Sequence, residues 1–201
     1  MNKFAKFLSF LVLAIFISSC ASVSQYQTAK PTGEGKTNLK ITANGNIREA
    51  REGIPPLIPE FGINYGVTDK FDFICKLNSF GSLSFGGKYT LLTESNDKFA
   101  IAVGPTMNYF GKIFNVTIPL HITIEPNELF SFTITPSYTT PGAYKLKDNA
   151  NNYYKQINGG FFSFAPYLVV GKKVKFIFGS NISFAKSSIY TDYGFGVNFQ
   201  F

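Results

Sequence analysis

The stretch Asp192–Phe201, DYGFGVNFQF, decides the fold class of this chain of 201 residues. Read two residues at a time, it places aromatic and branched apolar side chains on one face and small or polar side chains on the other. The apolar face carries Tyr193, Phe195, Val197, Phe199 and Phe201. Because successive side chains of a β-strand point to opposite faces, this alternation predicts a strand with one apolar face and one small, polar face.

The same period of two continues through the chain from Asn38 onward, and no window of useful length favours an amphipathic helix. Further strands are predicted over residues 38–44, 61–67, 71–77, 83–91, 99–109, 114–124, 130–138, 162–170 and 174–184. After the first, none of these runs carries a charged side chain on its apolar face. The sequence therefore predicts an all-β fold with about ten antiparallel strands, with about eight as the alternative.

Composition favours a membrane barrel over a soluble one. Charged residues make up 15% of the chain, against about 25% in ordinary soluble domains, and the chain contains 23 Phe and 11 Tyr. A soluble lipocalin-like barrel or a sandwich also alternates, but it turns a strongly charged face to water. Here the predicted polar face consists mostly of Gly, Ser, Asn and Thr, which suit a crowded lumen. We predict an up-and-down transmembrane β-barrel, with a lipid-anchored soluble β-barrel or sandwich that acts as a binding module as the alternative.

Four prolines oppose this prediction. Pro105, Pro119, Pro136 and Pro166 lie inside predicted strands, and a closed barrel has no edge strand in which to place them. We expect them to mark bulges or strand ends near the rim.

The final strand, Asp192–Phe201, resembles the closing strand of bacterial outer-membrane β-barrels, which alternates aromatic residues and ends on Phe. The resemblance implies location in the outer membrane, with short turns at one end of the barrel and longer loops at the other. The connections agree with it. Short polar turns are predicted at 68–70, 94–97, 125–128 and 171–173, whereas the alternate connections include the long segments 45–59 and 140–158.

The beginning of the chain is typical of an export signal. Lys3 and Lys6 precede the apolar run Leu8–Ile17, which is too short to span a bilayer as a helix. The tetrapeptide Ile17–Cys20 resembles the lipobox of bacterial lipoproteins, which implies that Cys20 becomes the first mature residue and carries acyl chains such as palmitate. An ordinary secretory signal with an incidental cysteine is the alternative.

These observations divide the chain into three parts. Residues 1–19 are predicted to be a signal peptide, residues 20–37 a lipidated flexible tether, and residues 38–201 the outer-membrane barrel. The tether is poor in apolar residues and rich in Ser, Thr, Gly, Lys and Gln, so it cannot bury enough surface to fold alone.

One pair of charges is predicted inside the barrel. If residues 79–81 form a hairpin loop, Asp72 lies directly opposite Lys88, and both side chains face the lumen. Because an isolated charge in a narrow, partly dehydrated interior is costly, we expect the two to form an ion pair.

The chain's only histidine suggests an enzyme, but a plainer interpretation exists. His121 shares the inner face of one strand with Thr123 and Glu125, and the set resembles the His, Ser and Glu of outer-membrane lipid A deacylases, with Thr in place of the Ser nucleophile. The plainer interpretation is a lumen-lining histidine, so we expect no enzyme, with a lipid A acyl hydrolase as the weaker alternative. We expect no metal or cofactor, because Cys75 lies on the apolar face and His121 has no His or Cys at ligand spacing.

The segment 140–158 is the candidate ligand-contact loop. It combines aromatic and basic residues that suit sugar rings and phosphates, namely Tyr144, Lys145, Lys147, Tyr153, Tyr154 and Lys155. The expected partners are outer-membrane lipid and lipopolysaccharide, with a small solute or an anionic glycan as a ligand, and no feature indicates nucleic-acid binding. We therefore predict an outer-membrane β-barrel lipoprotein with a structural, surface-binding or narrow-channel role. The sequence does not determine its oligomeric state.

Overall fold

The period of two corresponds to strands in the computed structural model, which describes residues 26–46, 57–79, 81–94, 98–110, 113–147, 152–157, 160–185 and 188–201. Among these residues no helix is long and apolar enough to span a membrane. The strands are β1 (Thr37–Asn46), β2 (Ile58–Gly66), β3 (Phe71–Asn78), β4 (Leu83–Thr93), β5 (Phe99–Val103), β6 (Thr106–Phe110), β7 (Ile113–Asn127), β8 (Phe130–Thr139), β9 (Gly142–Lys147), β10 (Asn152–Ile157), β11 (Phe161–Val170), β12 (Val174–Ala185) and β13 (Ser188–Gln200).

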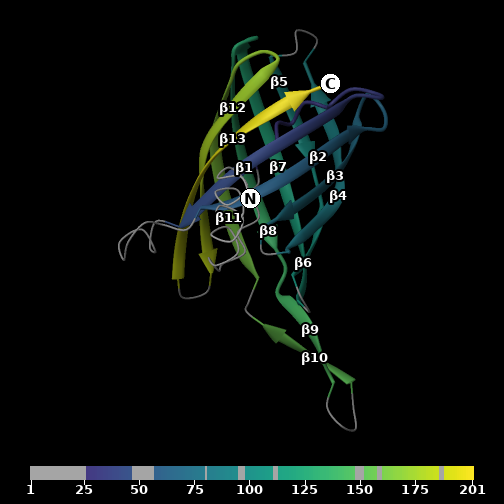
Figure 1. The fold of residues 1–201 in the computed structure, drawn as a ribbon, viewed down its shortest axis with the longest axis vertical. Coiled ribbons are helices and arrows are strands. Elements are labelled where there is room, and N and C mark those ends of the chain that lie inside the picture. Colours follow the sequence, from purple (N-terminus) through teal and green to yellow (C-terminus); the bar gives the residue numbers. More distant parts are fainter. Residues whose placement is uncertain are drawn as a thin grey trace, which may run out of the picture.

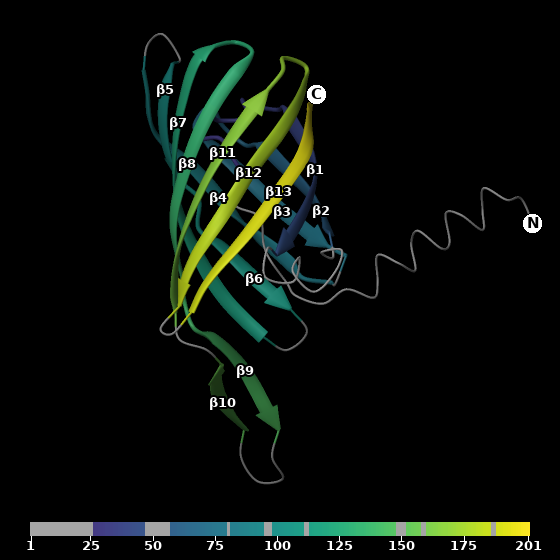
Figure 2. The ribbon, with the colours of Figure 1, turned by 90° about the vertical axis from the view of Figure 1, so that its left-hand side faces the viewer.

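The strands close into one antiparallel barrel (Figures 1 and 2). The ring is closed because β1 pairs with β2 on one side and with the last strand, β13, on the other. β5 and β6 both lie between β4 and β7, so they form one wall strand that is interrupted at Gly104 and Pro105. With β9 and β10 outside the ring, the wall has ten strands, which confirms the predicted number and class.

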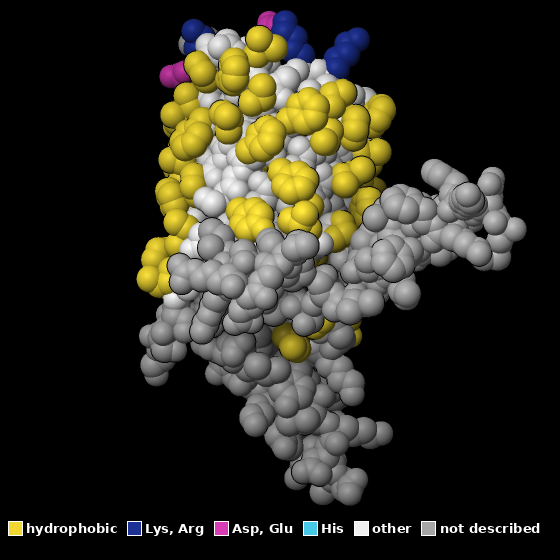
Figure 3. All heavy atoms as spheres, turned by 60° about the vertical axis from the view of Figure 1, so that its left-hand side comes forward, with side chains coloured by type: hydrophobic (Ala, Val, Ile, Leu, Met, Phe, Trp, Pro, Cys, Tyr) yellow, Lys and Arg dark blue, Asp and Glu magenta, His cyan; other side chains and the backbone are white. Residues whose placement is uncertain are grey.

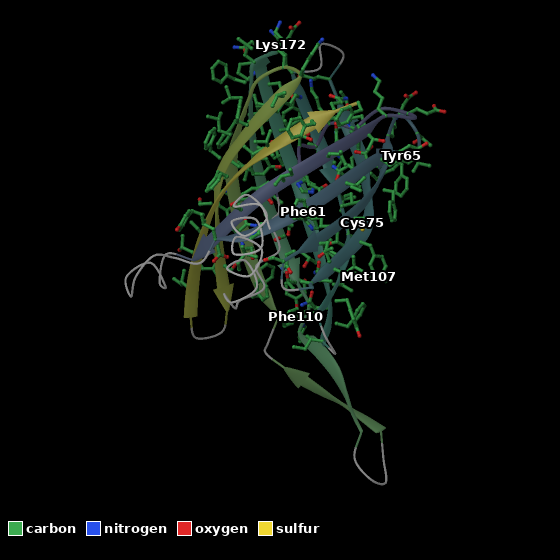
Figure 4. The ribbon with its side chains drawn as sticks, viewed as in Figure 1. Phe61, Tyr65, Cys75, Met107, Phe110 and Lys172 are labelled. Carbon is green, nitrogen blue, oxygen red and sulfur yellow. The ribbon has the colours of Figure 1, made fainter. Side chains whose placement is uncertain are left out.

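The apolar face of every wall strand points outward. Phe61 is 55% exposed and Phe178 is 52% exposed, whereas lumen-facing Asn64 and Ile177 are each 2% exposed. In the face of the wall that Figure 3 shows, hydrophobic side chains are spread over the described surface, and charged side chains gather at one end of it. Phe61, Tyr65 and Met107 project away from the wall in Figure 4. The alternative of a soluble barrel, whose aromatic side chains would point inward, is therefore wrong.

The two ends of the barrel differ. At the turn end, defined by the β2–β3, β4–β5, β7–β8 and β11–β12 connections, the start of β1 meets the end of the chain: Thr37 and Phe201 exchange backbone hydrogen bonds of 3.1 and 2.9 Å. Lys172 and Glu128 form an exposed ion pair of 2.7 Å there, and the hydrogen bond from Lys172 lowers the pKa of Glu128. The opposite end, where β9 and β10 extend beyond the wall (Figure 1), is called the hairpin end.

The prolines behave differently from one another. Pro105 lies at a strand end, as predicted, but this end is the interruption between β5 and β6 within one wall strand and not the rim. Its backbone approaches Gly86 so closely that no side chain fits at residue 86. Pro119, Pro136 and Pro166 instead stay within β7, β8 and β11 and keep their register with the neighbouring strands, so the expectation of bulges or strand ends is wrong for them. Each costs at most one ladder hydrogen bond, because a strand residue directs its N–H toward only one neighbour.

Two predicted loops have more structure than expected. Residues 26–33, assigned to the flexible tether, lie inside the barrel and are buried or half-buried, whereas residues 34–36 are exposed at its end. The segment 140–158, predicted as a loop, contains the β9–β10 hairpin. Its alternating Tyr, Leu and Ile residues favour strands, and the length of the connection concealed this signal.

Candidate functional site in the barrel lumen

The lumen segment, residues 26–36, enters the barrel from the turn end. Residues 26–33 are buried or half-buried, whereas residues 34–36 are exposed, and Gly35 and Lys36 form backbone hydrogen bonds of 2.9 and 3.0 Å with Gly66 of β2.

The segment's residues contact β1, β3, β4, β7, β11 and β13, which are distributed around the whole ring. Tyr26 lies near the middle of the barrel, beside Gly179 and Gly194, and Thr32 lies at the turn end, beside Asp72 and Gln200. The segment therefore fills the lumen from its middle to the turn end.

The wall holds the lumen segment chiefly by donating hydrogen bonds to its backbone. The carbonyls of residues 26, 27, 28, 29, 30 and 32 each accept a hydrogen bond from a wall side chain. The bonds come from Lys40 to residue 26 (3.3 Å), Tyr167 to residue 27, Lys88 to residues 28 and 30 (2.9 and 2.6 Å), Thr90 to residue 29 (3.0 Å) and Gln200 to residue 32 (3.3 Å). These contacts satisfy main-chain acceptors that burial would otherwise leave unpaired.

Fewer wall groups accept hydrogen bonds from the segment. The Ala29 N–H donates to Thr123 Oγ1 at 2.7 Å, and the Thr32 N–H donates to both carboxylate oxygens of Asp72 at 2.9 and 3.0 Å. Lys30 forms an ion pair of 2.6 Å with Glu125. The wall thus binds the main chain of the segment through more hydrogen bonds than it makes to the segment's side chains.

Small residues in the wall make room for Tyr26. Its ring packs against Tyr167 edge to face, with centroids 5.5 Å apart and planes at 75°. A Cβ atom at Gly194 would lie 2.6 Å from the Tyr26 hydroxyl and 2.5 Å from Asn44 Oδ1, and a Cβ atom at Gly179 would lie 2.9 Å from the Tyr26 ring. Glycine at residues 179 and 194 therefore leaves the space that the Tyr26 ring occupies.

We expect Gly194→Ala to displace Tyr26, because the added methyl group occupies the space of its hydroxyl. Overpacking of this kind costs about 1–3 kcal/mol, and the backbone amides of residues 26–32 should lose protection in hydrogen–deuterium exchange. Gly62→Ala is the matched control, because a Cβ atom there meets only ordinary contacts of 3.6 Å. Equal protection in both variants would contradict the conclusion that Gly194 leaves the space in which Tyr26 binds.

The predicted lumenal ion pair is present. Asp72 and Lys88 are directly opposite in the β3–β4 register, and Lys88 Nζ lies 3.0 Å from Asp72 Oδ2. Their side chains are 0% and 2% exposed. The pair also organises the lumen segment, since Asp72 accepts from Thr32 while Lys88 donates to the Thr28 and Lys30 carbonyls.

Further charged side chains lie beside this pair. Lys40, Lys76 and Glu60 are 8%, 5% and 4% exposed and project from the inner faces of β1, β3 and β2. Lys40 uses the carbonyl of Tyr26, a neutral acceptor, as one of its partners. The sequence analysis named only Asp72 and Lys88 as lumenal charges, and it did not foresee that a peptide segment would lie between the charged side chains.

The residues of the deacylase comparison do not assemble into a catalytic set. His121, Thr123 and Glu125 share the lumen side of β7, but His121 Nδ1 pairs with Thr135 Oγ1 at 3.0 Å. The Thr123 hydroxyl pairs with Thr133 at 2.8 Å and also accepts the Ala29 N–H. Glu125 is paired with Lys30. The three side chains therefore bond to other residues of the wall or to the lumen segment. The described residues contain no group of three or more side chains suited to hold a metal ion.

The remaining candidate residues lie elsewhere. Cys20 falls outside the described residues, while Cys75 is a free cysteine on the outward side of β3. The residues of the candidate ligand-contact loop belong to β9 and β10, where the backbone register places Lys145 opposite Tyr154 and Lys155 opposite Tyr144. The hairpin joins the wall through two residue pairs between β7 and β9.

Comparison with known proteins agrees with this architecture. No family model and no curated protein matches the chain. Among solved structures, the NanC porin matches with a TM-score of 0.52 and 9% identity, over 80% of this chain and 98% of that chain. The chain has the fold of an outer-membrane β-barrel.

Other barrels of this fold also match. The N-terminal β-barrel domain of OprF from Pseudomonas aeruginosa is 9% identical over 84% of this chain and 99% of its own, with a TM-score of 0.40. Ail of Yersinia pestis, in a phospholipid bilayer nanodisc, is 10% identical over 84% of this chain and 100% of its own, with a TM-score of 0.45.

Proposed function

We propose that this protein is a lipid-anchored outer-membrane β-barrel with a closed lumen, which binds ligands at its hairpin end. The observation that carries the proposal is the combination of an apolar outer wall and a lumen filled by the chain's own residues. The outer wall is suited to contact with the hydrocarbon of a membrane, because every wall strand turns apolar side chains outward. The lumen segment argues against a passive pore in the resting protein.

The lipid anchor rests on the sequence Ile17–Cys20 and its resemblance to a lipobox. Acylation of Cys20 should be abolished by Cys20→Ser, measured as loss of labelled palmitate from the protein. The barrel should be unaffected, so both proteins should show heat-modifiable gel migration after extraction from the outer-membrane fraction. A protein that migrates identically before and after boiling would contradict the closed barrel, whereas palmitate retained in Cys20→Ser would contradict only the anchor.

The hairpin end supports the binding role. The β9–β10 hairpin extends beyond the wall in both ribbon views (Figures 1 and 2), and its sequence contains three Tyr and three Lys residues. Aromatic faces bind sugar rings, and ammonium groups bind phosphate or carboxylate. The ligand we propose is an anionic glycan, including the phosphorylated sugars of lipopolysaccharide.

The binding role is tested by removing charge from the hairpin. Replacing Lys145, Lys147 and Lys155 together with Gln should weaken binding to vesicles that contain lipopolysaccharide. Each lysine near an anionic surface contributes about 1 kcal/mol, so the loss should be on the order of 100-fold.

The matched control removes the same charge from the opposite end. Lys70, Lys172 and Lys173 lie exposed in turns at the turn end, so their joint replacement with Gln should leave binding unchanged. Equal losses in the two triple variants would show that net charge alone governs binding and would contradict a site on the hairpin.

A further inference from the structure

The lumen segment rises from the turn end toward the middle of the barrel as its residue numbers fall. Thr32 contacts Asp72 and Gln200 at the turn end. Tyr26 lies beside Gly194, which is six residues from either end of β13. The chain that precedes Tyr26 therefore starts from the middle of the lumen, and a lipid anchor on it requires that it leave the barrel at one of the two ends.

The turn end is closed to that chain. Residues 26–33 already occupy this half of the lumen, and their hydrogen bonds reach β1, β3, β4, β7, β11 and β13 around the ring. Gly35 and Lys36 continue the chain at the rim, where they pair with the backbone of Gly66. Because the interior of an eight-stranded barrel is just filled by side chains, a ten-stranded wall leaves little room for a second chain beside the first.

The hairpin end lies within reach of the residues before Tyr26. Six residues of β13 separate Gly194 from the hairpin end, which corresponds to about 20 Å along the strand and about 15 Å along the barrel axis at the usual tilt. Cys20 precedes Tyr26 by six residues. An extended chain of this length spans about 20 Å, so it is long enough to bring Cys20 to the membrane surface at the hairpin end.

The inner wall on this route carries unpaired polar groups. Within the part of the chain that the structure describes, Asn44 Nδ2, Asn108 Oδ1 and Ser137 Oγ are buried and have no hydrogen-bond partner. Asn108 and Ser137 lie in the hairpin-end half of the wall, on β6 and β8. An extended main chain supplies N–H donors and carbonyl acceptors to such groups. The sequence of residues 21–25, ASVSQ, is mostly small or polar and suits a narrow polar lumen.

We propose that the N-terminal chain threads the barrel from the turn end to the hairpin end, so that the lipid on Cys20 inserts into the outer leaflet of the outer membrane. The inference rests on the proposed lipid anchor and adds the leaflet that the anchor occupies. The hairpin end, which carries the longer connections, faces the outside in barrels of this fold. The partner of the anchor is therefore the outer-leaflet lipid around the hairpin, and the barrel itself holds the acylated terminus at the cell surface.

Cysteine labelling of the full chain tests this arrangement. Every variant carries Cys75→Ser, because Cys75 is a free cysteine, and a membrane-impermeant maleimide is added either to intact cells or to cells with a permeabilised outer membrane. Ser22→Cys should react on intact cells to the same extent as Asn152→Cys, which lies on the β9–β10 hairpin. Glu34→Cys is the matched control, because residue 34 is exposed at the turn end and should react only after permeabilisation.

A second variant covers the case in which residue 22 lies inside the mouth of the barrel. If Ser22→Cys reacts in neither preparation, the sequence Gly-Ser-Cys-Ser-Gly is inserted between residues 21 and 22, on the lipid's side of the lumen. The inserted cysteine should react on intact cells. Reaction only after permeabilisation, or only after unfolding in urea, overturns the threading.

The outcomes separate the threading from the lipid anchor. A heat-modifiable protein that carries labelled palmitate, but whose Ser22→Cys reacts in the same preparation as Glu34→Cys, overturns the threading and leaves the anchor intact. If Asn152→Cys reacts only after permeabilisation, the barrel has the opposite orientation and the outer-leaflet placement is overturned. The parent with Cys75→Ser alone should stay unlabelled, because its remaining cysteine is acylated; reaction of this parent would show a free Cys20 thiol and contradict the anchor.

Discussion

Asp72→Ala is expected to destabilise the barrel by about 3–5 kcal/mol, because removal of one partner leaves a buried charge uncompensated. The side chain of Lys88 is 2% exposed and would lose the carboxylate that lies 3.0 Å away. Thr32 would lose the acceptor of its N–H and of its hydroxyl at the same time. The free energy of unfolding should be measured by urea titration of the protein refolded into phospholipid vesicles.

Two comparisons separate the buried pair from a general charge effect. Glu128→Ala breaks the exposed pair with Lys172 and should leave the unfolding transition unchanged, because solvent screens that pair. The double variant Asp72→Ala with Lys88→Met should recover part of the lost stability, since it removes the unpaired ammonium group. If Asp72→Ala unfolds like wild type, the pair is not desolvated and the account of the lumen is wrong.

Phe178→Lys should cost about 2–4 kcal/mol in vesicles, because it places an ammonium group near the middle of the hydrocarbon. Phe178 is 52% exposed and lies between the outward residues Leu168 and Phe195 of the neighbouring strands. Val174→Lys lies on the same face of the same strand, at the turn end, and should cost only about 0–1 kcal/mol.

The difference in cost between Phe178→Lys and Val174→Lys shows whether hydrocarbon or water contacts the outer face of the barrel. On a water-exposed wall both lysines would remain hydrated, and neither substitution would change stability by much. Equal and small effects at Phe178 and Val174, measured by the same urea titration, would therefore contradict the membrane-embedded barrel. The comparison needs no ligand and no assay of function.

The strands, their inward and outward faces and the Asp72–Lys88 pair were predictable because they follow from local geometry. A strand has a side-chain period of two, so the identity of alternate residues assigns each face wherever hydrocarbon lies on one side and a polar lumen on the other. The predicted hairpin loop at residues 79–81 fixed the register of β3 and β4, and this register places the two charges opposite each other. An even number of strands makes the first and last wall strands antiparallel, which is the orientation in which β1 and β13 pair.

The sequence by itself thus determined the wall of this protein: an all-β chain whose apolar rings face outward. Only the tertiary structure decided what lies inside the wall. Residues 26–36 are poor in apolar side chains, and such a composition suits both water and a polar lumen, so no local signal distinguishes a free tether from a segment bound inside the barrel. Hydrogen bonds from strands far apart in the sequence make that choice, and they exist only after the barrel has closed.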